Sequence, residues 1–132
     1  SIGFALPAAL GAWSATQDFE AYRGRKVISV SGDGGFAQYA MEFTTAVRHN
    51  MDITHILLNN AELGKISKEQ RSGEFQVWQT DLVNPSFATF ARQCGGQGTR
   101  VSKPDALAEA SREAIAHPGP ALVEINTDVE LV

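Results

Sequence analysis

Cysteine is nearly absent from the sequence, because Cys94 is the only one, and no disulfide bond can form within the chain. A chain without internal disulfides fits a reducing compartment, and we expect a cytoplasmic location. Histidine is also scarce, and His49, His55 and His117 lie too far apart to show a metal-binding spacing. We interpret the histidines as structural residues and Cys94 as a small buried hydrophobic residue on a helix.

Long hydrophobic runs and basic clusters are absent as well. No apolar stretch approaches the roughly 20 residues that cross a bilayer, and the first residues lack the charged-then-apolar pattern of a signal peptide. With 11 Lys and Arg against 15 Asp and Glu, the formal net charge of −4 argues against a nucleic-acid-binding surface. We therefore expect neither a nucleic-acid partner nor an integral membrane segment.

The composition of the chain is that of an ordinary globular protein, with 43% hydrophobic and 20% charged residues. Together with the length of 132 residues, it predicts a single domain that spans residues 1–132. Two short apolar runs, residues 26–31 and 53–58, have the character of buried strands. Between them, apolar residues recur at helical spacing and predict one amphipathic helix, whose inner positions are Phe36, Tyr39, Ala40, Phe43 and Val47.

The same alternation continues on both sides of this unit. We predict helices at residues 6–15, from 84 to about 94 and at 104–116, and strands at 98–101 and 121–125. Asn84 is the expected N-cap of the second of these helices, with Pro85 at its first position. The expected inner stripes are Phe87, Phe90, Ala91 and Cys94 in that helix, and Leu107, Ala114 and Ile115 in the last. Strands that alternate with helices predict an α/β fold, a three-layer, doubly wound, mostly parallel sheet with helices on both faces.

Two turns with polar residues follow the strands at 26–31 and 53–58. The first reads Gly-Asp-Gly-Gly and contains Asp33, and the second begins with Asn-Asn and contains Asn60. Because the carboxyl ends of parallel strands meet at one edge of a sheet, both turns should face one crevice. Asp33 and Asn60 offer hard oxygen ligands to a magnesium-sized ion, while Gly34 and Gly35 expose backbone N–H groups at a helix start, where an anion is favoured. Alone, the first turn could be only a tight connection, but the pairing predicts a metal with a phosphate.

The two turns also resemble a known signature. Gly-Asp-Gly at 32–34, followed after a helix and a strand by Asn-Asn at 59–60, resembles the thiamin diphosphate motif of the thiamin diphosphate-dependent enzymes. The segment SIGFALPAALG at 1–11 is similar to the part of these enzymes that precedes the motif. Nearly the whole chain resembles their C-terminal cofactor-diphosphate-binding domain, in the branch that contains pyruvate oxidase, acetolactate synthase and the 2-oxo acid decarboxylases.

The resemblance implies a set of site residues. Mg²⁺ would be held by Asp33, Asn60 and the main-chain carbonyl of Glu62, whose side chain need not take part. The position that matches Ile2 is an apolar wedge beneath the cofactor, although an exposed terminal residue is the alternative. Lys65 could lie near the cofactor or be a solvated lysine. The expected cofactor-binding residues are Ile2, Gly32, Asp33, Gly34, Gly35, Asn60, Glu62, Leu63 and Gly64.

The resemblance also implies a larger enzyme that acts on 2-oxo acids by decarboxylation or carboligation. Because the first residue already belongs to the cofactor segment, we expect a C-terminal fragment of a multidomain homo-oligomer, with the cofactor between two subunits. The intact protein could also carry FAD on another domain. The activating glutamate of the family lies on a separate domain and has no counterpart here, so we assign no catalytic residue and expect the isolated domain to be inactive.

Residues 67–80 show neither sustained periodicity nor much apolar content, and we predict a long loop there. Its aromatic residues, Phe75 and Trp78, could anchor an interface with other domains or pack on the core of this domain. Two other functions remain open for the whole chain. It could be a non-catalytic, flavodoxin-like module that binds another phosphate-containing ligand, or a structural fragment that binds none.

Overall fold

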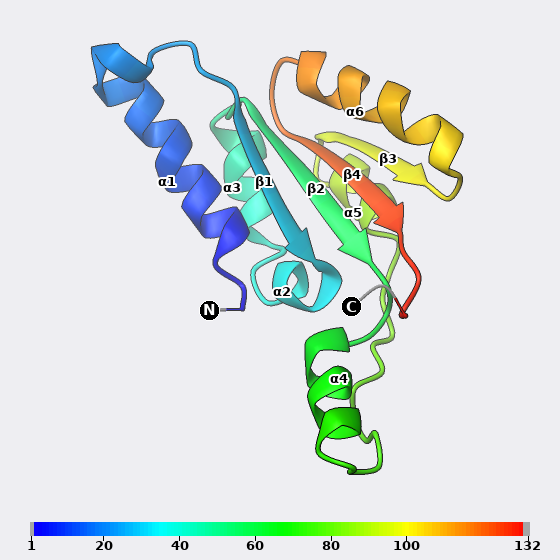
Figure 1. Cartoon of the computed structure of the whole chain (residues 1–132). Coiled ribbons are helices and arrows are strands. Elements are labelled where there is room, and N and C mark those ends of the chain that lie inside the picture. Colours follow the sequence, from blue (N-terminus) through cyan, green and yellow to red (C-terminus); the bar gives the residue numbers. More distant parts are fainter. Residues whose placement is uncertain (1, 131–132) are drawn as a thin grey trace.

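The structure is a computed structural model that describes residues 2–130. Ser1, the first residue of the segment expected to precede the cofactor motif, lies outside the described residues. In chain order (Figure 1), the elements are α1 (Ala5–Asp18), the 3₁₀ helix η1 (Glu20–Tyr22), β1 (Val27–Gly32), α2 (Asp33–Ala37), α3 (Glu42–Arg48), β2 (Ile53–Asn59), α4 (Gly64–Ser72), α5 (Phe87–Gln93), β3 (Gln97–Val101), the 3₁₀ helix η2 (Pro104–Ala106), α6 (Leu107–Ala116) and β4 (Ala121–Asn126).

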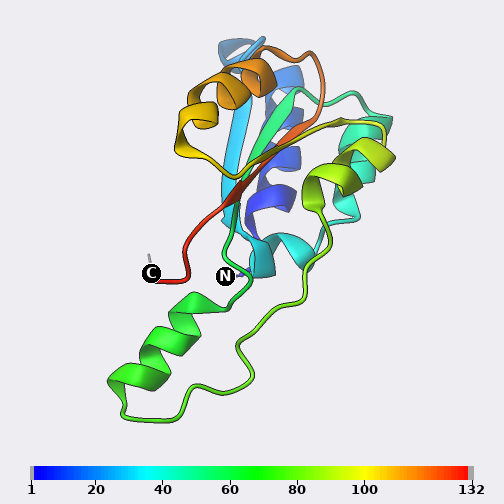
Figure 2. The same ribbon diagram turned by 90° about the vertical axis from the view of Figure 1, so that its right-hand side faces the viewer.

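The four strands form one parallel sheet in the order β1-β2-β4-β3. Helices α1, α3 and α5 cover one face, and α6 covers the other (Figure 2). This arrangement confirms the predicted α/β fold with helices on both faces of a parallel sheet. Within residues 2–130, no helix is both long and apolar enough to cross a membrane.

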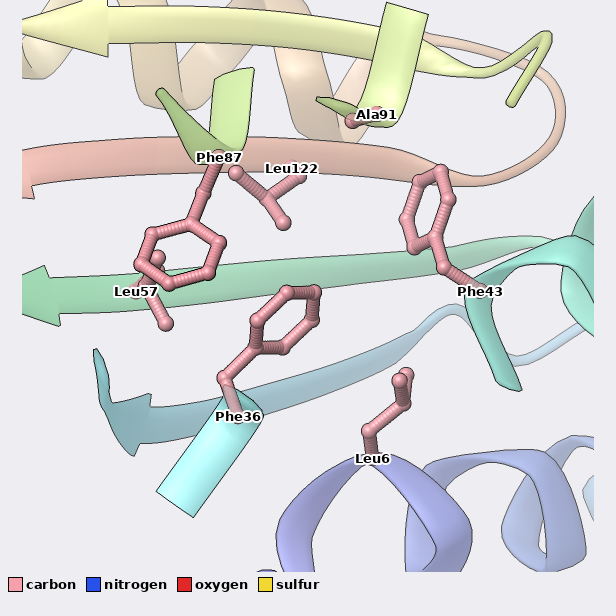
Figure 3. Packing of buried hydrophobic residues seen from close by; sticks show 7 residues of the cluster. All are labelled: Leu6, Phe36, Phe43, Leu57, Phe87, Ala91 and Leu122. Atoms are coloured by element: carbon pink, nitrogen blue, oxygen red, sulfur yellow. The ribbon is translucent and has the colours of Figure 1, made fainter. Parts of the chain in front are cut away.

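The main hydrophobic core lies between the sheet and the helices of the α1 face (Figure 3). Its members come from six helices and strands and are Leu6, Phe36, Phe43, Leu57, Phe87, Ala91 and Leu122. The Phe36 ring packs edge-on against Phe87, with 5.3 Å between ring centroids. Burial of a phenylalanine side chain stabilises a fold by about 1.5–3 kcal/mol, so Phe36 fixes the short helix α2 and the turn before it. Cys94 is partly buried against this core, and the burial raises the pKa of its thiol, as expected of a small hydrophobic residue.

The first strand is less buried than the sequence predicts. Ile28 and Val30 are each at least half exposed, while Ser29 and Ser31 point toward the other face and are partly covered. The reason is that β1 is an edge strand, and α6, the helix on the Ile28 side, packs on β3 and β4. The prediction of a buried strand is therefore correct for β2 and wrong for β1.

The single helix predicted after β1 is two helices. Helix α2 ends at Ala37 and α3 begins at Glu42, and Tyr39, expected on the inner face, is exposed. Between α2 and α3, hydrogen bonds join residues three positions apart, as from the Glu42 N–H to the Tyr39 carbonyl, in place of the four-residue spacing of an α-helix. The change of direction allows both Phe36 and Phe43 to reach the core, where each is buried. Packing of the two rings therefore overrides the continuous helical period.

The predicted start of α5 is also wrong. The helix begins at Phe87, and Ser86 is its N-cap, because the Ser86 hydroxyl accepts a hydrogen bond from the Thr89 N–H at 3.3 Å. Asn84 lies outside the helix, and its side chain is used in the site described below. The predicted inner stripe of α5 is confirmed, since Phe87 and Ala91 are buried and Phe90 and Cys94 pack against the same core.

In α6, the inner face consists of small residues. Ala110 and Ala114 are buried against the sheet, whereas Leu107 and Ile115, both predicted to face inward, are exposed. Small side chains at the contact allow the helix to lie close to β3 and β4, which leaves the larger residues at its margins. The predicted stripe is therefore correct for Ala114 alone.

The segment predicted as a loop contains a helix, because α4 covers residues 64–72. It projects from the body of the domain, and the chain returns in an irregular stretch (Figures 1 and 2). Phe75 is 72% exposed and Trp78 is 69% exposed, so these aromatic residues do not pack on the core of this domain. The return stretch is held by Gln70, whose side chain accepts from the Trp78 N–H at 3.0 Å and donates to the Trp78 carbonyl at 3.2 Å. We call residues 64–82 the arm.

Candidate functional site

A cavity of about 620 Å³ opens at the carboxyl ends of β1 and β2, and it lies within the size range of small-molecule sites. Both predicted turns line it. All of the expected cofactor-binding residues are present in its wall, namely Ile2, Gly32, Asp33, Gly34, Gly35, Asn60, Glu62, Leu63 and Gly64. The structure therefore brings these residues together, while their individual binding roles stay predictions.

Strand pairing places the two turns side by side. Strands β1 and β2 are parallel and in register, with Gly32 opposite Leu58, so the residues that follow them emerge next to each other. Asp33, which is only 2% exposed, accepts a hydrogen bond at Oδ2 from the Ala61 N–H at 2.9 Å. This bond ties the first turn to the second.

The Asp33 carboxylate is held from one side. Its Oδ2 also accepts from Asn84 Nδ2 at 2.5 Å, so two donors share this oxygen. Among the described residues, the structure gives no hydrogen bond to the other oxygen, Oδ1. A carboxylate oriented in this way by outer hydrogen bonds has one oxygen available for a cation.

The second turn closes on itself. Asn60 Oδ1 accepts from the Glu62 N–H at 3.1 Å, which is the local turn that asparagine side chains favour, and Ala61 has a positive φ of 56°. The Glu62 side chain points toward the arm, where Oε1 accepts from the Ser67 hydroxyl at 2.5 Å and lies 3.8 Å from Arg71 Nη2. Its other oxygen, Oε2, is buried and has no hydrogen-bond partner within residues 2–130. The side chain is therefore engaged mainly away from Asn60, which agrees with a role for the main-chain carbonyl only.

Backbone N–H groups of two helices converge on the cavity. The first residues of α2 include Gly34 and Gly35, and α4 begins with Gly64 and Lys65, all of which line the wall. The first N–H groups of a helix have no intrahelical acceptor and are available to an anion. Because α2 has only five residues, its dipole is smaller than that of the longer helix predicted from the sequence. The nine-residue α4 provides a second helix start at the cavity, in a segment that the sequence analysis predicted to be mostly a loop.

Close packing explains one glycine of the first turn. A Cβ atom on Gly34 would lie 2.8 Å from Leu63 Cδ2 and 3.2 Å from Leu82 Cδ1, so a side chain there would require these two leucine side chains to shift. A Cβ atom on Gly35 would make only ordinary contacts, the nearest at 3.5 Å from the Gly3 nitrogen. Gly34 therefore leaves room for the Leu63 and Leu82 side chains beside the first turn.

Ile2 and Lys65 were left with two interpretations each. Ile2 is 58% exposed and lines the cavity, so its placement permits the wedge role without testing it. Lys65 also lines the cavity, but its ammonium group pairs with Glu69 at 3.2 Å, and both side chains are mostly exposed. This pairing favours the interpretation of Lys65 as a solvated lysine.

A buried histidine contacts the strand that leads into the first turn. His55 is fully buried in β2, with Nδ1 2.7 Å from the Ser29 hydroxyl and Nε2 2.9 Å from the Ser31 hydroxyl. Its ring lies 5.0 Å from the Phe36 ring, and burial lowers the pKa of His55 to about 4. A neutral histidine that bonds two hydroxyl groups between β1 and β2 supports its interpretation as a structural residue.

Three polar residues at the site were not identified from the sequence. They are Asn59, Asn84 and Glu124, which form hydrogen bonds behind Asp33. The sequence pattern predicted that Asn84 is a helix N-cap, and it gave Asn59 no role beyond its place next to the predicted ligand Asn60. The one available signal was Glu124, a carboxylate within the apolar strand β4, because a charge in such a strand requires a polar partner.

The donor set fits a hard cation. Within residues 2–130, no three His, Cys, Asp or Glu side chains cluster as a metal site. The predicted donor set therefore combines the Asp33 carboxylate with the amide oxygen of Asn60 and the main-chain carbonyl of Glu62, all three of which line the cavity. Such oxygen ligands, with positions left for phosphate and water, suit Mg²⁺.

Comparison with known proteins agrees with this chemistry. Residues 1–125 match the family model of the thiamine pyrophosphate enzyme C-terminal TPP-binding domain, and thiamine pyrophosphate is another name for thiamin diphosphate. The chain is 35% identical to a putative thiamine pyrophosphate-containing protein, YdaP, and 35% identical to an acetolactate synthase, both of Bacillus subtilis. These alignments cover 95% and 97% of the chain and 21% of each relative.

A solved structure, benzoylformate decarboxylase from Polynucleobacter necessarius, has the same fold with a TM-score of 0.90 and 23% identity over 99% of the chain and 24% of that protein. The chain thus spans about a fifth of the length of the relatives it matches. The expected resemblance is confirmed, and the chain belongs to the thiamine pyrophosphate enzymes, within their C-terminal TPP-binding domain.

Proposed function

We propose that this chain binds thiamin diphosphate through Mg²⁺ as the C-terminal domain of an enzyme that decarboxylates or condenses 2-oxo acids. The observation that carries the proposal is the contact between the two turns, in which the Ala61 N–H and Asn84 orient the Asp33 carboxylate beside the cavity. The family match supports the cofactor. The relatives named above, an acetolactate synthase and a decarboxylase, support the reaction class.

Asp33, Asn60 and the Glu62 carbonyl would hold the metal. The N–H groups at the starts of α2 and α4 would bind phosphate oxygens of the cofactor. When bound, the cofactor supplies an electron sink for bond cleavage or formation at the 2-oxo carbon. The residues of this chain then act by anchoring and orienting that group.

The apolar part of the wall would hold the organic part of the cofactor. Ile2, Phe4, Val30, Leu58 and Ile66 all line the cavity. Apolar walls exclude water and strengthen the polar contacts at the metal end. In this proposal Ile2 would be the apolar wedge beneath the cofactor.

The remaining parts of the enzyme would come from elsewhere. Since the chain spans 21% of its relatives, we propose that other domains and a second subunit complete the active site and supply the activating glutamate. The exposed Phe75 and Trp78 on the arm would contact one of them. A flavin could be carried by another domain, but the relatives named here favour carboligation or decarboxylation over flavin-linked oxidation.

Calorimetry tests the proposal directly. We expect thiamin diphosphate to bind in the presence of Mg²⁺ and to lose most of its affinity when a chelator removes the metal. Equal affinity with and without the chelator would contradict the metal-mediated site. Binding of a flavin or a nucleotide in place of thiamin diphosphate would instead favour the non-catalytic, flavodoxin-like alternative. No release of carbon dioxide from pyruvate is expected from these 132 residues alone.

A further inference from the structure

A line of hydrogen bonds connects a fully buried carboxylate in β4 to Asp33 at the cavity. The bonds join residues that are far apart in the sequence, since Glu124 and Asn59 are separated by 65 positions and Asn84 and Asp33 by 51. We call Glu124, Asn59, Asn84 and Asp33 the Asn59 network.

The inner end of the network is Glu124. Its two oxygens have different partners, because Oε1 accepts from Asn59 Nδ2 at 2.8 Å and Oε2 accepts from the Ala88 N–H at 2.9 Å. Arg100 Nε lies 3.8 Å from Oε1 and offsets the charge. Burial of a carboxylate away from water costs free energy unless its oxygens accept hydrogen bonds. Both Glu124 oxygens must therefore keep the donors that they have in this structure.

Glu124 determines which way the Asn59 amide faces. Because the carboxylate can only accept, it selects the NH₂ end of the amide and directs the carbonyl end, Oδ1, away from the core. Oδ1 then accepts from Asn84 Nδ2 at 3.0 Å and from the Ala61 N–H at 3.2 Å. A rotated amide would present its NH₂ group to these two donors, and neither bond could form.

The outer end of the network is the Asp33 carboxylate. Asn84 Nδ2 donates to both Asn59 Oδ1 and Asp33 Oδ2, and the Ala61 N–H lies between the same two acceptors. The position of Asn59 Oδ1 therefore helps to set Asn84 and Ala61, and these two donors set Asp33. Glu124 thus affects Asp33 through the orientation of the Asn59 amide and through the two donors, Asn84 and the Ala61 N–H, that Asn59 shares with Asp33.

We propose that Glu124 is a positioning residue for the cofactor site. By orienting the Asn59 amide, it holds the Asp33 carboxylate and the backbone at Ala61 in the geometry that receives the metal. The inference rests on the proposed function, in which Asp33 is a metal ligand. Glu124 also accepts from the start of α5, so a purely structural role is the competing explanation, and the test must separate the two.

Exchanging the carboxylate at position 124 with the amide at position 59 provides that test. Glu124→Gln keeps the size of the side chain but replaces one acceptor with an NH₂ group, so Asn59 Nδ2 and the Ala88 N–H can no longer both be satisfied. Asn59→Asp alone places a second carboxylate against Glu124. The double variant Glu124→Gln/Asn59→Asp restores every hydrogen bond of the Asn59 network, because the new carboxylate at position 59 accepts from the NH₂ group at 124 and from Asn84 and Ala61, although the ion pair with Arg100 is lost.

Two measurements on the full-length protein report on the network. The first is hydrogen exchange of the Ala61 amide without cofactor, and the second is the affinity for thiamin diphosphate with Mg²⁺. Each single variant should speed Ala61 exchange and weaken the affinity by about 10–100-fold, the usual effect of losing an outer partner of a metal ligand. The double variant should exchange more slowly and bind more tightly than either single variant.

Thr54→Val is the matched control, because Thr54 is also buried and its hydroxyl donates to the Ala114 carbonyl at 2.9 Å, at the opposite end of β2. It should lower the melting temperature and leave Ala61 exchange unchanged. Normal Ala61 exchange in Glu124→Gln, or a double variant no better than the single ones or unable to fold, would overturn the proposal. A wild-type protein that binds no thiamin diphosphate would refute the proposed function, while Ala61 exchange would still decide whether the network orients Asp33.

Discussion

The Ala61 N–H donates to Asp33 Oδ2 across 2.9 Å, although the two residues are 28 positions apart. Ala61 has a positive φ of 56°, a conformation that costs an alanine about 1 kcal/mol or more. The turn adopts it because the bond to a buried carboxylate, together with the bond to Asn59, outweighs the strain. The same carboxylate is therefore both part of the fold and the predicted ligand of the metal.

Asp33→Ala should consequently affect both binding and stability. Affinity for thiamin diphosphate with Mg²⁺ should be lost, because the one carboxylate of the donor set is removed. The free energy of unfolding should fall by about 1–3 kcal/mol, since the Ala61 N–H and Asn84 lose their acceptor. Calorimetry and urea unfolding measure the two effects. A variant that retains metal-dependent binding would contradict the assignment of Asp33, and helical circular dichroism should persist because Asp33 is not a core hydrophobic residue.

The pH dependence of stability should contain a contribution from His55. Burial lowers the pKa of His55 to about 4 from its ordinary value of 6.5, so the unfolded chain binds a proton between these values and the folded chain does not. Stability therefore rises with pH across this window, and the contribution present at neutral pH is lost as the pH falls from about 6.5 to 4. Its full size is roughly 3 kcal/mol.

The variant His55→Gln tests this contribution, because it can still bond Ser29 and Ser31 but does not titrate. Its free energy of unfolding should fall less steeply than that of the wild type as the solution is acidified. Urea unfolding at a series of pH values measures the difference between the two curves. Parallel curves would show that folding does not lower the pKa of His55.

Two glycine substitutions should have opposite effects on the fold. A Cβ atom on Gly98 would lie 2.0 Å from the Ala88 carbonyl oxygen, and backbone cannot easily move away, so Gly98→Ala should destabilise the protein by about 3 kcal/mol or more. A Cβ atom on Gly11, in the middle of α1, would meet nothing within 4 Å. Gly11→Ala should raise the free energy of unfolding by about 0.5–1 kcal/mol.

Equilibrium unfolding in urea measures both glycine variants. If Gly98→Ala is as stable as the wild type, β3 and α5 do not pack as closely as described here. If Gly11→Ala is destabilised, α1 has a packing partner beyond the described residues on its Gly11 side.

The arm should matter for assembly more than for folding. Trp78 is 69% exposed, so Trp78→Ser should change the stability of the isolated domain by less than about 0.5 kcal/mol. In the full-length protein the same change should weaken the association of subunits or domains, because an exposed aromatic anchor is removed. Sedimentation at several concentrations measures this association. Unchanged sedimentation would exclude Trp78 from the interface.

Much of the architecture could be predicted from local patterns. The strands at β2 and β4 and the helix α1 follow from runs and periods of apolar residues, which depend on neighbours in the sequence. The meeting of Asp33 and Asn60 at one cavity also follows, because parallel strands joined by helices must present their carboxyl ends at one edge. Local sequence patterns were insufficient where tertiary packing determines the structure, as at the break between α2 and α3 and on the exposed side of β1.

The sequence by itself therefore determined the α/β fold and the paired turns, since periodicity and strand direction are properties of the chain. Only the tertiary structure decided the roles of Glu124, Asn59 and Asn84. A polar side chain has several partners open to it, and the one it binds depends on which donors and acceptors burial brings within about 3 Å. Asn84 is suited to cap a helix, but in the folded chain Asp33 and Asn59 lie within reach and Ser86 caps α5 instead.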